Sequence, residues 1–158
     1  MIDETDQQIL MLLQDDARLS NAAIAEQVGL TASTIFERIK KLEKRGVIKK
    51  YVAIVDPAEV GRPITAFVRL TVGATVEGNY VDTKRQLTDI CQAEPEIVEC
   101  HTVAGEDCYI LKARVATPQR LESLIERIRC HTLVTRTTSN IVLSTFKEDT
   151  KVAIADPC

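Results

Sequence analysis

The 158-residue sequence lacks any apolar run longer than a few residues, so no segment of it is long enough to span a membrane. It also lacks the basic start and apolar stretch of a secretory signal, because Asp3 and Glu4 make the amino end acidic. Its five cysteines include no CxxC pair and are odd in number, which favours reduced thiols over a disulfide framework. We therefore expect a cytoplasmic protein of one or two domains that binds no membrane.

Motifs of catalysis and of cofactor binding are missing as well. There is no nucleophile elbow, phosphate-binding loop or dinucleotide fingerprint, and no spacing of cysteine and histidine resembles a zinc site. Cys100 and His101 are neighbours on an expected strand and would point to opposite faces, so they cannot easily share a metal. We expect no enzyme, no cofactor and no metal, and buried apolar positions for the cysteines. Cys108 is the exception, because it falls in an expected turn, where exposure would allow redox activity.

The net charge of −3 hides an uneven distribution of charge along the chain. Residues 1–28 hold six acids and one base, whereas residues 36–51 hold seven bases and two acids. A locally basic segment can neutralise nucleic-acid phosphates even when the whole protein is acidic. A solvated helix face would produce the same run of charge, so charge alone does not decide between the two interpretations.

Apolar residues at helical spacing predict three helices in the first half of the chain. The first covers about residues 5–16, with Thr5 or Asp6 as its cap. The second begins at a Ser20 cap and ends at Gly29, where a helix can finish in the left-handed conformation.

A third helix begins at Thr31 and ends at Gly46, and it forms a helix-turn-helix with the second. Ala25 is small enough for two helix backbones to meet, Gly29 tolerates a positive φ in the turn, and Ile35 packs back against the preceding helix. This spacing is typical of DNA-binding proteins. A plain three-helix bundle with a solvated basic face is the alternative.

The outward face of the third helix has hydroxyl side chains near its start and bases further on. In recognition helices, residues at the start contact base edges, and basic residues contact phosphates. We therefore predict an interface for double-stranded DNA that comprises Thr31, Ser33, Thr34, Glu37, Arg38, Lys41 and Lys44. The following segment, Val47–Val55, is predicted to form one or two short strands.

The second half of the chain has a mixed pattern of strands and helices beyond the turn signals at Asp56-Pro57 and Gly61-Arg62-Pro63. Strands are predicted at residues 64–72, 97–103, 109–115 and 134–146, and helices at residues 80–93 and from Pro118 onward. This βαββαβ order is that of a ferredoxin-like, α+β domain, whose antiparallel sheet has both helices on one face. The other face needs cover, and a second copy of the chain is the simplest candidate.

Four stretches of the first half combine into a recognisable set. They are Asp3-x-x-Asp6-x-x-Ile9-Leu10, Ala17-Arg18-Leu19-Ser20, Ile24-Ala25-x-x-Val28-Gly29-Leu30-Thr31 and Arg38-Ile39-x-x-Leu42-Glu43-x-x-Gly46-Val47-Ile48. This set resembles the feast/famine, or Lrp/AsnC, family of transcription regulators. The resemblance implies a winged helix-turn-helix over residues 1–50, a strand linker over 51–62, an effector-sensing and oligomerisation domain over 63–148, and a tail over 149–158. It also implies homodimers that assemble into tetramers or octamers.

The family binds small effectors, typically amino acids, near the turn between the second and third strands of the second domain. The resemblance therefore implies an effector site at Gly105, Asp107, Cys108, Thr137 and Ser139. Gly105 matches the family turn, but Cys108 stands where the family has an aspartate. The ammonium group of an amino acid needs a carboxylate partner, which a neutral thiol cannot supply. Either Asp107 substitutes, or the ligand differs, or no ligand binds and Asp107 is an ordinary turn acid.

The sequence thus predicts a sequence-specific DNA-binding transcription regulator that is modulated by a small molecule such as an amino acid. Some sirohaem decarboxylases resemble it in their two-domain architecture and would use His101 or His131 beside a tetrapyrrole. A pure assembly module is a third interpretation. The basic third helix disfavours the enzyme, which does not need it.

Overall fold

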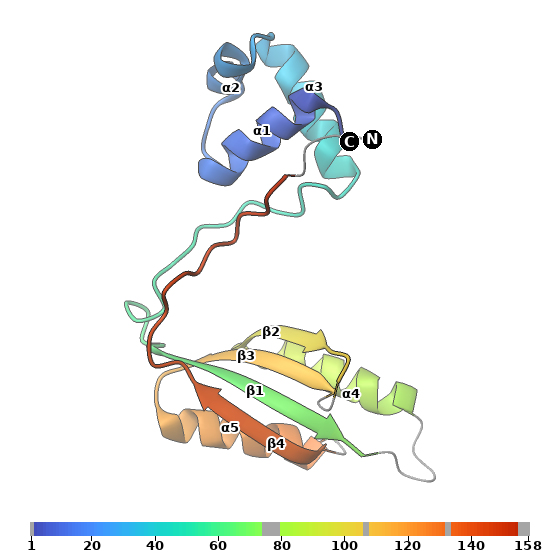
Figure 1. Ribbon diagram of the computed structural model, residues 1–158, viewed down its shortest axis with the longest axis vertical. Helices are drawn as coiled ribbons and strands as arrows, with labels where there is room; N and C mark the ends of the chain where they lie inside the picture. The colour runs from blue at the N-terminus through green and yellow to red at the C-terminus, as the bar shows by residue number, and fades with distance from the viewer. Residues whose placement is uncertain (1, 74–79, 106–107, 132–133, 155–158) are drawn as a thin grey trace. The chain divides into compact units, whose positions relative to one another are not determined.

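A computed structural model describes residues 2–73, 80–105, 108–131 and 134–154 of the chain (Figure 1). The chain divides into two compact units. The first comprises residues up to Ile54 together with the tail from Lys147, and the second comprises Val55–Phe146. Among the described residues, no helix has the length and apolar character needed to cross a membrane.

The first unit contains the helices α1 (Glu4–Asp15), α2 (Asn21–Val28) and α3 (Ala32–Lys44). Each begins behind a side chain that accepts a backbone N–H of the first turn, and these caps are Asp3, Ser20 and Thr31. The predicted starts of the second and third helices are thereby confirmed. The first helix begins earlier than predicted, because Asp3 is its cap and forms a capping box with Asp6.

The helix-turn-helix packs as its spacing predicts. Ile9, Ile24 and Ile35, one from each helix, are fully buried in a common core. Gly29 has a φ of 74°, a conformation that is unfavourable for residues with a side chain. Its N–H donates to the Ala25 carbonyl at 2.9 Å. The turn therefore returns α3 against the other two helices through its apolar side.

The strands expected over Val47–Val55 are absent from the structure. A strand needs a partner for its backbone hydrogen bonds, and none of the four described strands pairs with these residues.

The tail of the chain contacts α1. Gln14 donates from Nε2 to the Val152 carbonyl at 3.2 Å and accepts the Val152 N–H at 2.7 Å. Lys151 adds an ion pair to Asp15 at 2.5 Å.

The second unit contains β1 (Ile64–Val72), α4 (Tyr80–Ala93), β2 (Ile97–Thr102), β3 (Tyr109–Val115), α5 (Pro118–His131) and β4 (Val134–Ile141). Its strands form one antiparallel sheet in the order β2-β3-β1-β4, as a ferredoxin-like βαββαβ domain requires (Figure 1). The last strand ends at Ile141 rather than at the predicted Phe146, because its partner β1 begins at Ile64.

Alternate residues of the central strands face the two helices of the second unit. On β1, Ala66 and Val68 are fully buried. They share one core with Leu87 of α4 and Leu124 of α5, so both helices cover the same face of the sheet. No described helix of this unit covers the opposite face, where Phe67 is 40% exposed.

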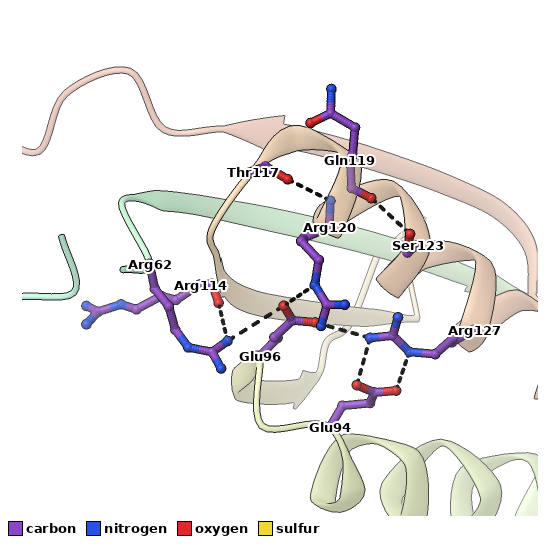
Figure 2. A network of polar contacts seen from close by, with 9 residues as sticks. All are labelled: Arg62, Glu94, Glu96, Arg114, Thr117, Gln119, Arg120, Ser123 and Arg127. Carbon is purple, nitrogen blue, oxygen red and sulfur yellow. Dashed lines mark hydrogen bonds and ion pairs between the residues drawn. The ribbon is translucent and has the colours of Figure 1, made fainter. Parts of the chain in front are cut away.

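A buried carboxylate, that of Glu96, lies where α4 leads into β2 (Figure 2). It contacts Arg120 Nε and Arg127 Nη2 of α5, each at 3.1 Å, and Arg62 Nη1 ahead of β1 at 3.7 Å. Glu94 adds a two-point ion pair to Arg127 at 2.6 and 2.9 Å, which lowers the pKa of Glu94. Removing one partner of a buried ion pair typically costs about 3–5 kcal/mol, because the other charge stays buried. The network thus holds the α4–β2 connection against α5 and the start of β1.

Candidate nucleic-acid interface and effector region

Helix α3 has two faces of different chemistry. Ile35, Ile39 and Leu42 are buried against the other helices. Six of the seven side chains predicted to meet DNA are exposed, namely Thr31, Ser33, Thr34, Glu37, Lys41 and Lys44. The exposed side therefore offers hydroxyl groups at its start and positive charge in its last turns.

Three hydroxyl groups gather at the start of α3. Thr31 Oγ1 accepts the Thr34 N–H at 3.2 Å and lies 3.0 Å from Ser33 Oγ and 2.9 Å from Thr34 Oγ1. The Thr31 hydroxyl is therefore engaged as the helix cap. The exposed hydroxyls of Ser33 and Thr34 retain hydrogen-bonding capacity for a bound molecule.

Arg38, the seventh predicted residue, is held inside the first unit. Its Nη1 atom contacts Asp3 Oδ2 at 2.7 Å and Asp6 Oδ1 at 2.8 Å, and the Asp6 side chain is only 9% exposed. The hydrogen bond from Arg38 lowers the pKa of Asp3, so the pair stabilises the fold above the usual aspartate pKa and loses this contribution as the pH falls through the lowered value. Arg38 thus ties α3 to the first turn of α1, and this role competes with its predicted contact to DNA.

Phe36 is an exposed aromatic residue of α3 that sequence reasoning missed. It is 45% exposed, and Lys40 Nζ lies 5.7 Å from the centroid of its ring. The sequence held a signal for this exposure, because Phe36 directly follows the inward-facing Ile35 and is therefore turned about 100° further around the helix. An aromatic ring at such a position can contact a thymine methyl group in the major groove.

The predicted effector residues that the structure describes on β3 and β4 lie at related positions of the sheet. Cys108 donates its N–H to the Leu70 carbonyl at 2.9 Å, and Thr137 is the β4 partner of the same Leu70. Cys108 and Thr137 therefore flank β1 at one level of the sheet, about 10 Å apart by two strand spacings. Ser139 lies two residues further along β4, opposite Val68.

Thr137 has a property that suits a ligand site. Its hydroxyl oxygen is buried and has no hydrogen-bond partner among the described residues. Leaving a buried hydroxyl unsatisfied costs about 1–3 kcal/mol, which a ligand that bonds to it would recover. Gly105 is exposed, with a φ of 142° that favours glycine, and Asp107 lies outside the described residues.

The cysteines depart from the expected pattern. Cys108, expected to be exposed in its turn, is half-buried and packs against the core of the second unit. Cys100 and Cys130, expected to be buried, are exposed, because Cys100 lies on the edge strand β2 and Cys130 lies near the end of α5. Cys91 is half-buried, and Cys158 lies outside the described residues.

His101 belongs to no cluster of potential metal ligands in the part of the chain that the structure describes. Cys100 pairs with the buried Leu111, so its neighbour His101 turns to the other face, as predicted. His101 Nε2 lies 3.4 Å from Glu99 Oε2. No group of three potential metal ligands occurs within the described residues, and the His131 side chain falls outside them.

Two protein families match the chain. The winged helix-turn-helix DNA-binding family matches residues 2–49, and the Lrp/AsnC ligand binding domain matches residues 65–152. The first match ends soon after α3, and the second begins within β1 and extends into the tail.

Similarity to individual proteins extends over nearly the whole chain. The HTH-type transcriptional regulator LrpA of Mycobacterium tuberculosis is 36% identical over 148 residues, which are 94% of each chain. A feast or famine regulatory protein of M. tuberculosis, complexed with L-methionine, is 35% identical with a TM-score of 0.85 over 96% of this chain and 99% of that one. A Neisseria meningitidis transcriptional regulator in complex with L-methionine is 27% identical with a TM-score of 0.88 over 97% of both chains. These relatives favour the regulator over the sirohaem decarboxylase interpretation.

Replacing Arg38 tests whether it stabilises the fold. Arg38→Ala should lower the free energy of unfolding by about 1–3 kcal/mol, because it leaves the buried Asp6 carboxylate without this partner. Urea denaturation of the full chain, followed by circular dichroism, measures the change. The matched control Lys41→Ala removes an exposed base from the same helix and should change stability by less than about 0.5 kcal/mol. Equal stability of the two variants would contradict the structural role of Arg38.

Proposed function

The chain belongs to the Lrp/AsnC family of DNA-binding transcription regulators, and we propose that α3 reads operator DNA while the second unit senses an amino acid. The proposal that α3 reads DNA rests on its two different sides, since its buried side anchors the helix and its exposed side is basic. The unsatisfied Thr137 hydroxyl supports the second part. Further support comes from the two similar regulators whose structures contain L-methionine.

The groups on the exposed side of α3 suit different parts of DNA. Lys41 and Lys44 match phosphates, which attract positive charge irrespective of the base sequence. The hydroxyl of Ser33 can bond to a base edge or a phosphate, and Glu37 can accept from a cytosine amino group. Phe36 matches a thymine methyl group. We therefore assign sequence reading to the first two turns of α3 and backbone binding to its last turns.

Removing two lysines tests the backbone assignment. Lys41→Ala/Lys44→Ala should weaken binding to every DNA sequence, because two phosphate contacts are lost. The slope of log affinity against log salt should fall in magnitude by about 0.9 per contact, and so by about 2 in the double variant. Fluorescence anisotropy over about 50–200 mM salt measures this slope for a duplex selected by the wild-type protein and for a scrambled duplex.

Two further variants serve as controls for this experiment. Arg85→Ala/Arg129→Ala removes two exposed bases from α4 and α5 and should leave the slope unchanged. Phe36→Ala should reduce the preference for the selected duplex without changing the slope, because a methyl contact carries no charge. An unchanged slope in a folded Lys41→Ala/Lys44→Ala protein would refute the assignment of α3 to DNA.

The open face of the sheet is the surface on which we place a homodimer. Phe67 is 40% exposed there and lies between Lys112 of β3 and Asn140 of β4. Because α4 and α5 pack on the other face, a second copy can approach without displacing them. The same patch would face itself across a two-fold axis. Assembly of such dimers into tetramers or octamers is the further expectation from the family.

A charge at the centre of this face should disrupt the dimer. Light scattering of the wild-type chain at micromolar concentration should give at least twice the chain mass of 17.5 kDa. Phe67→Asp should shift the mass toward one chain, because symmetry brings two unpaired carboxylates into one interface. Gln119→Asp, on the exposed side of α5, should keep the wild-type mass. A monomeric wild-type protein, or a folded Phe67→Asp protein of wild-type mass, would speak against this interface.

L-Methionine is the probe for the proposed sensing site. Isothermal titration calorimetry should detect its binding to the full chain, with Asp107 as the partner of its ammonium group. Asp107→Asn should then weaken binding about ten- to a hundredfold, since a hydrogen bond to a charged group is worth about 1.5–3 kcal/mol. Cys108→Ser should change the affinity little, because a neutral thiol makes no such pair. The site would be overturned if L-methionine gave no binding heat, or if Asp107→Asn left the affinity for L-methionine unchanged.

A further inference from the structure

Two cysteines meet where α4 packs against the edge strand β2. Cys91 lies near the end of α4, and Cys100 lies within β2. Cys100 pairs with Leu111 of β3, which is buried under the helices, so the Cys100 side chain belongs to the helix-covered face of the sheet. Both side chains line the same pocket, and each thiol shifts the pKa of the other. The fold thus brings together two sulfur atoms that are nine positions apart in the sequence.

The pair is open to small molecules from solvent. Cys91 and Cys100 line a pocket of about 310 Å³, together with Lys84, Ile97 and Tyr109. Cys100 is exposed, whereas Cys91 is half-buried and packs against the core. A small oxidant can therefore reach Cys100 more readily than Cys91.

The local electrostatics give the two thiols different reactivities. The hydrogen bond from Cys91 lowers the pKa of Cys100 to about 7, against the opposing effect of burial and with a smaller contribution from the charge of His101. The same bond raises the pKa of Cys91. At neutral pH, Cys100 is thus thiolate in a large fraction of molecules, while Cys91 keeps its proton. Since the thiolate is the nucleophilic form, Cys100 is the attacking sulfur.

We propose that Cys91 and Cys100 form a reversible disulfide that links α4 to β2. With hydrogen peroxide as oxidant, the Cys100 thiolate attacks one oxygen to form a sulfenic acid, and the other oxygen leaves as hydroxide. The Cys91 sulfur then attacks the Cys100 sulfur, an S–S bond forms, and the sulfenic hydroxyl leaves with the Cys91 proton as water. The two sulfurs are oxidised by two electrons, and the peroxide is reduced by two. A low-molecular-weight dithiol reverses the step by exchange and is itself oxidised to a disulfide.

Peptide mapping of the full chain after peroxide treatment tests the proposal. Alkylation of the remaining thiols is followed by a protease that cuts after glutamate, because Glu96 and Glu99 separate Cys91 from Cys100, and Glu106 separates Cys100 from Cys108. The expected product is a Cys91–Cys100 linked peptide that lacks two hydrogens and disappears after treatment with dithiothreitol. Cys108→Ser, the matched control, should give the same product.

Variants of the pair distinguish the two roles. Cys91→Ser should leave Cys100 as a sulfenic acid that dimedone traps, and Cys100→Ser should leave Cys91 unmodified at the same peroxide concentration. The proposal is overturned if both cysteines of the wild-type protein are recovered unlinked after peroxide. It is also overturned if Cys100 links to Cys108 or to a second chain.

Discussion

In each of the two units, a buried carboxylate is neutralised by arginine from a helix to which the carboxylate does not belong. Asp6 is bound by Arg38 in the first unit, and Glu96 is bound by Arg120 and Arg127 in the second. Buried ion pairs add little stability relative to apolar packing, since both charges must leave water. Separating the partners is costly, however, because one charge is then buried alone. The main effect of these pairs is therefore to penalise displacement of α3 from α1 and of α5 from the α4–β2 connection.

This constraint determines which side chains α3 leaves exposed for the proposed contact with DNA. The sequence pattern placed Arg38 in the DNA interface, but its guanidinium is bound by two aspartates of the α1 cap. The exposed side is left with lysine, hydroxyl and aromatic groups, of which Phe36 had no place in the sequence-based prediction. A recognition helix must be oriented before it meets the groove, because loose positioning weakens every contact at once. In the proposed DNA interface, Arg38 thus acts through the position of α3.

Local signals in the sequence predicted much of the fold, but contacts between residues far apart in the sequence could not be predicted. The caps at Ser20 and Thr31 and the turn at Gly29 depend on neighbouring residues, so residue type and spacing suffice to find them. The βαββαβ order likewise follows from runs of apolar residues. By contrast, Arg38 meets Asp3 across 35 positions and Gln14 meets Val152 across 138, and many other partners were equally compatible with the sequence. The strands expected over Val47–Val55 failed for a related reason, since strand propensity does not supply a pairing partner.

Strand β2 connects the proposed disulfide to the turn of the proposed effector site. Cys100 lies two residues before Thr102, which pairs with Tyr109 directly after Cys108. The proposed disulfide would restrain β2 against α4, and a ligand at the turn that follows β2 would act on the same strand. If the disulfide changes the position of β2, oxidation and ligand binding are coupled, and the coupling free energy is the same in both directions. If the ligand binds more tightly to the oxidised protein, oxidation strengthens ligand binding, and the ligand favours formation of the disulfide by the same factor. If the ligand binds more weakly to the oxidised protein, the ligand disfavours formation of the disulfide by the same factor.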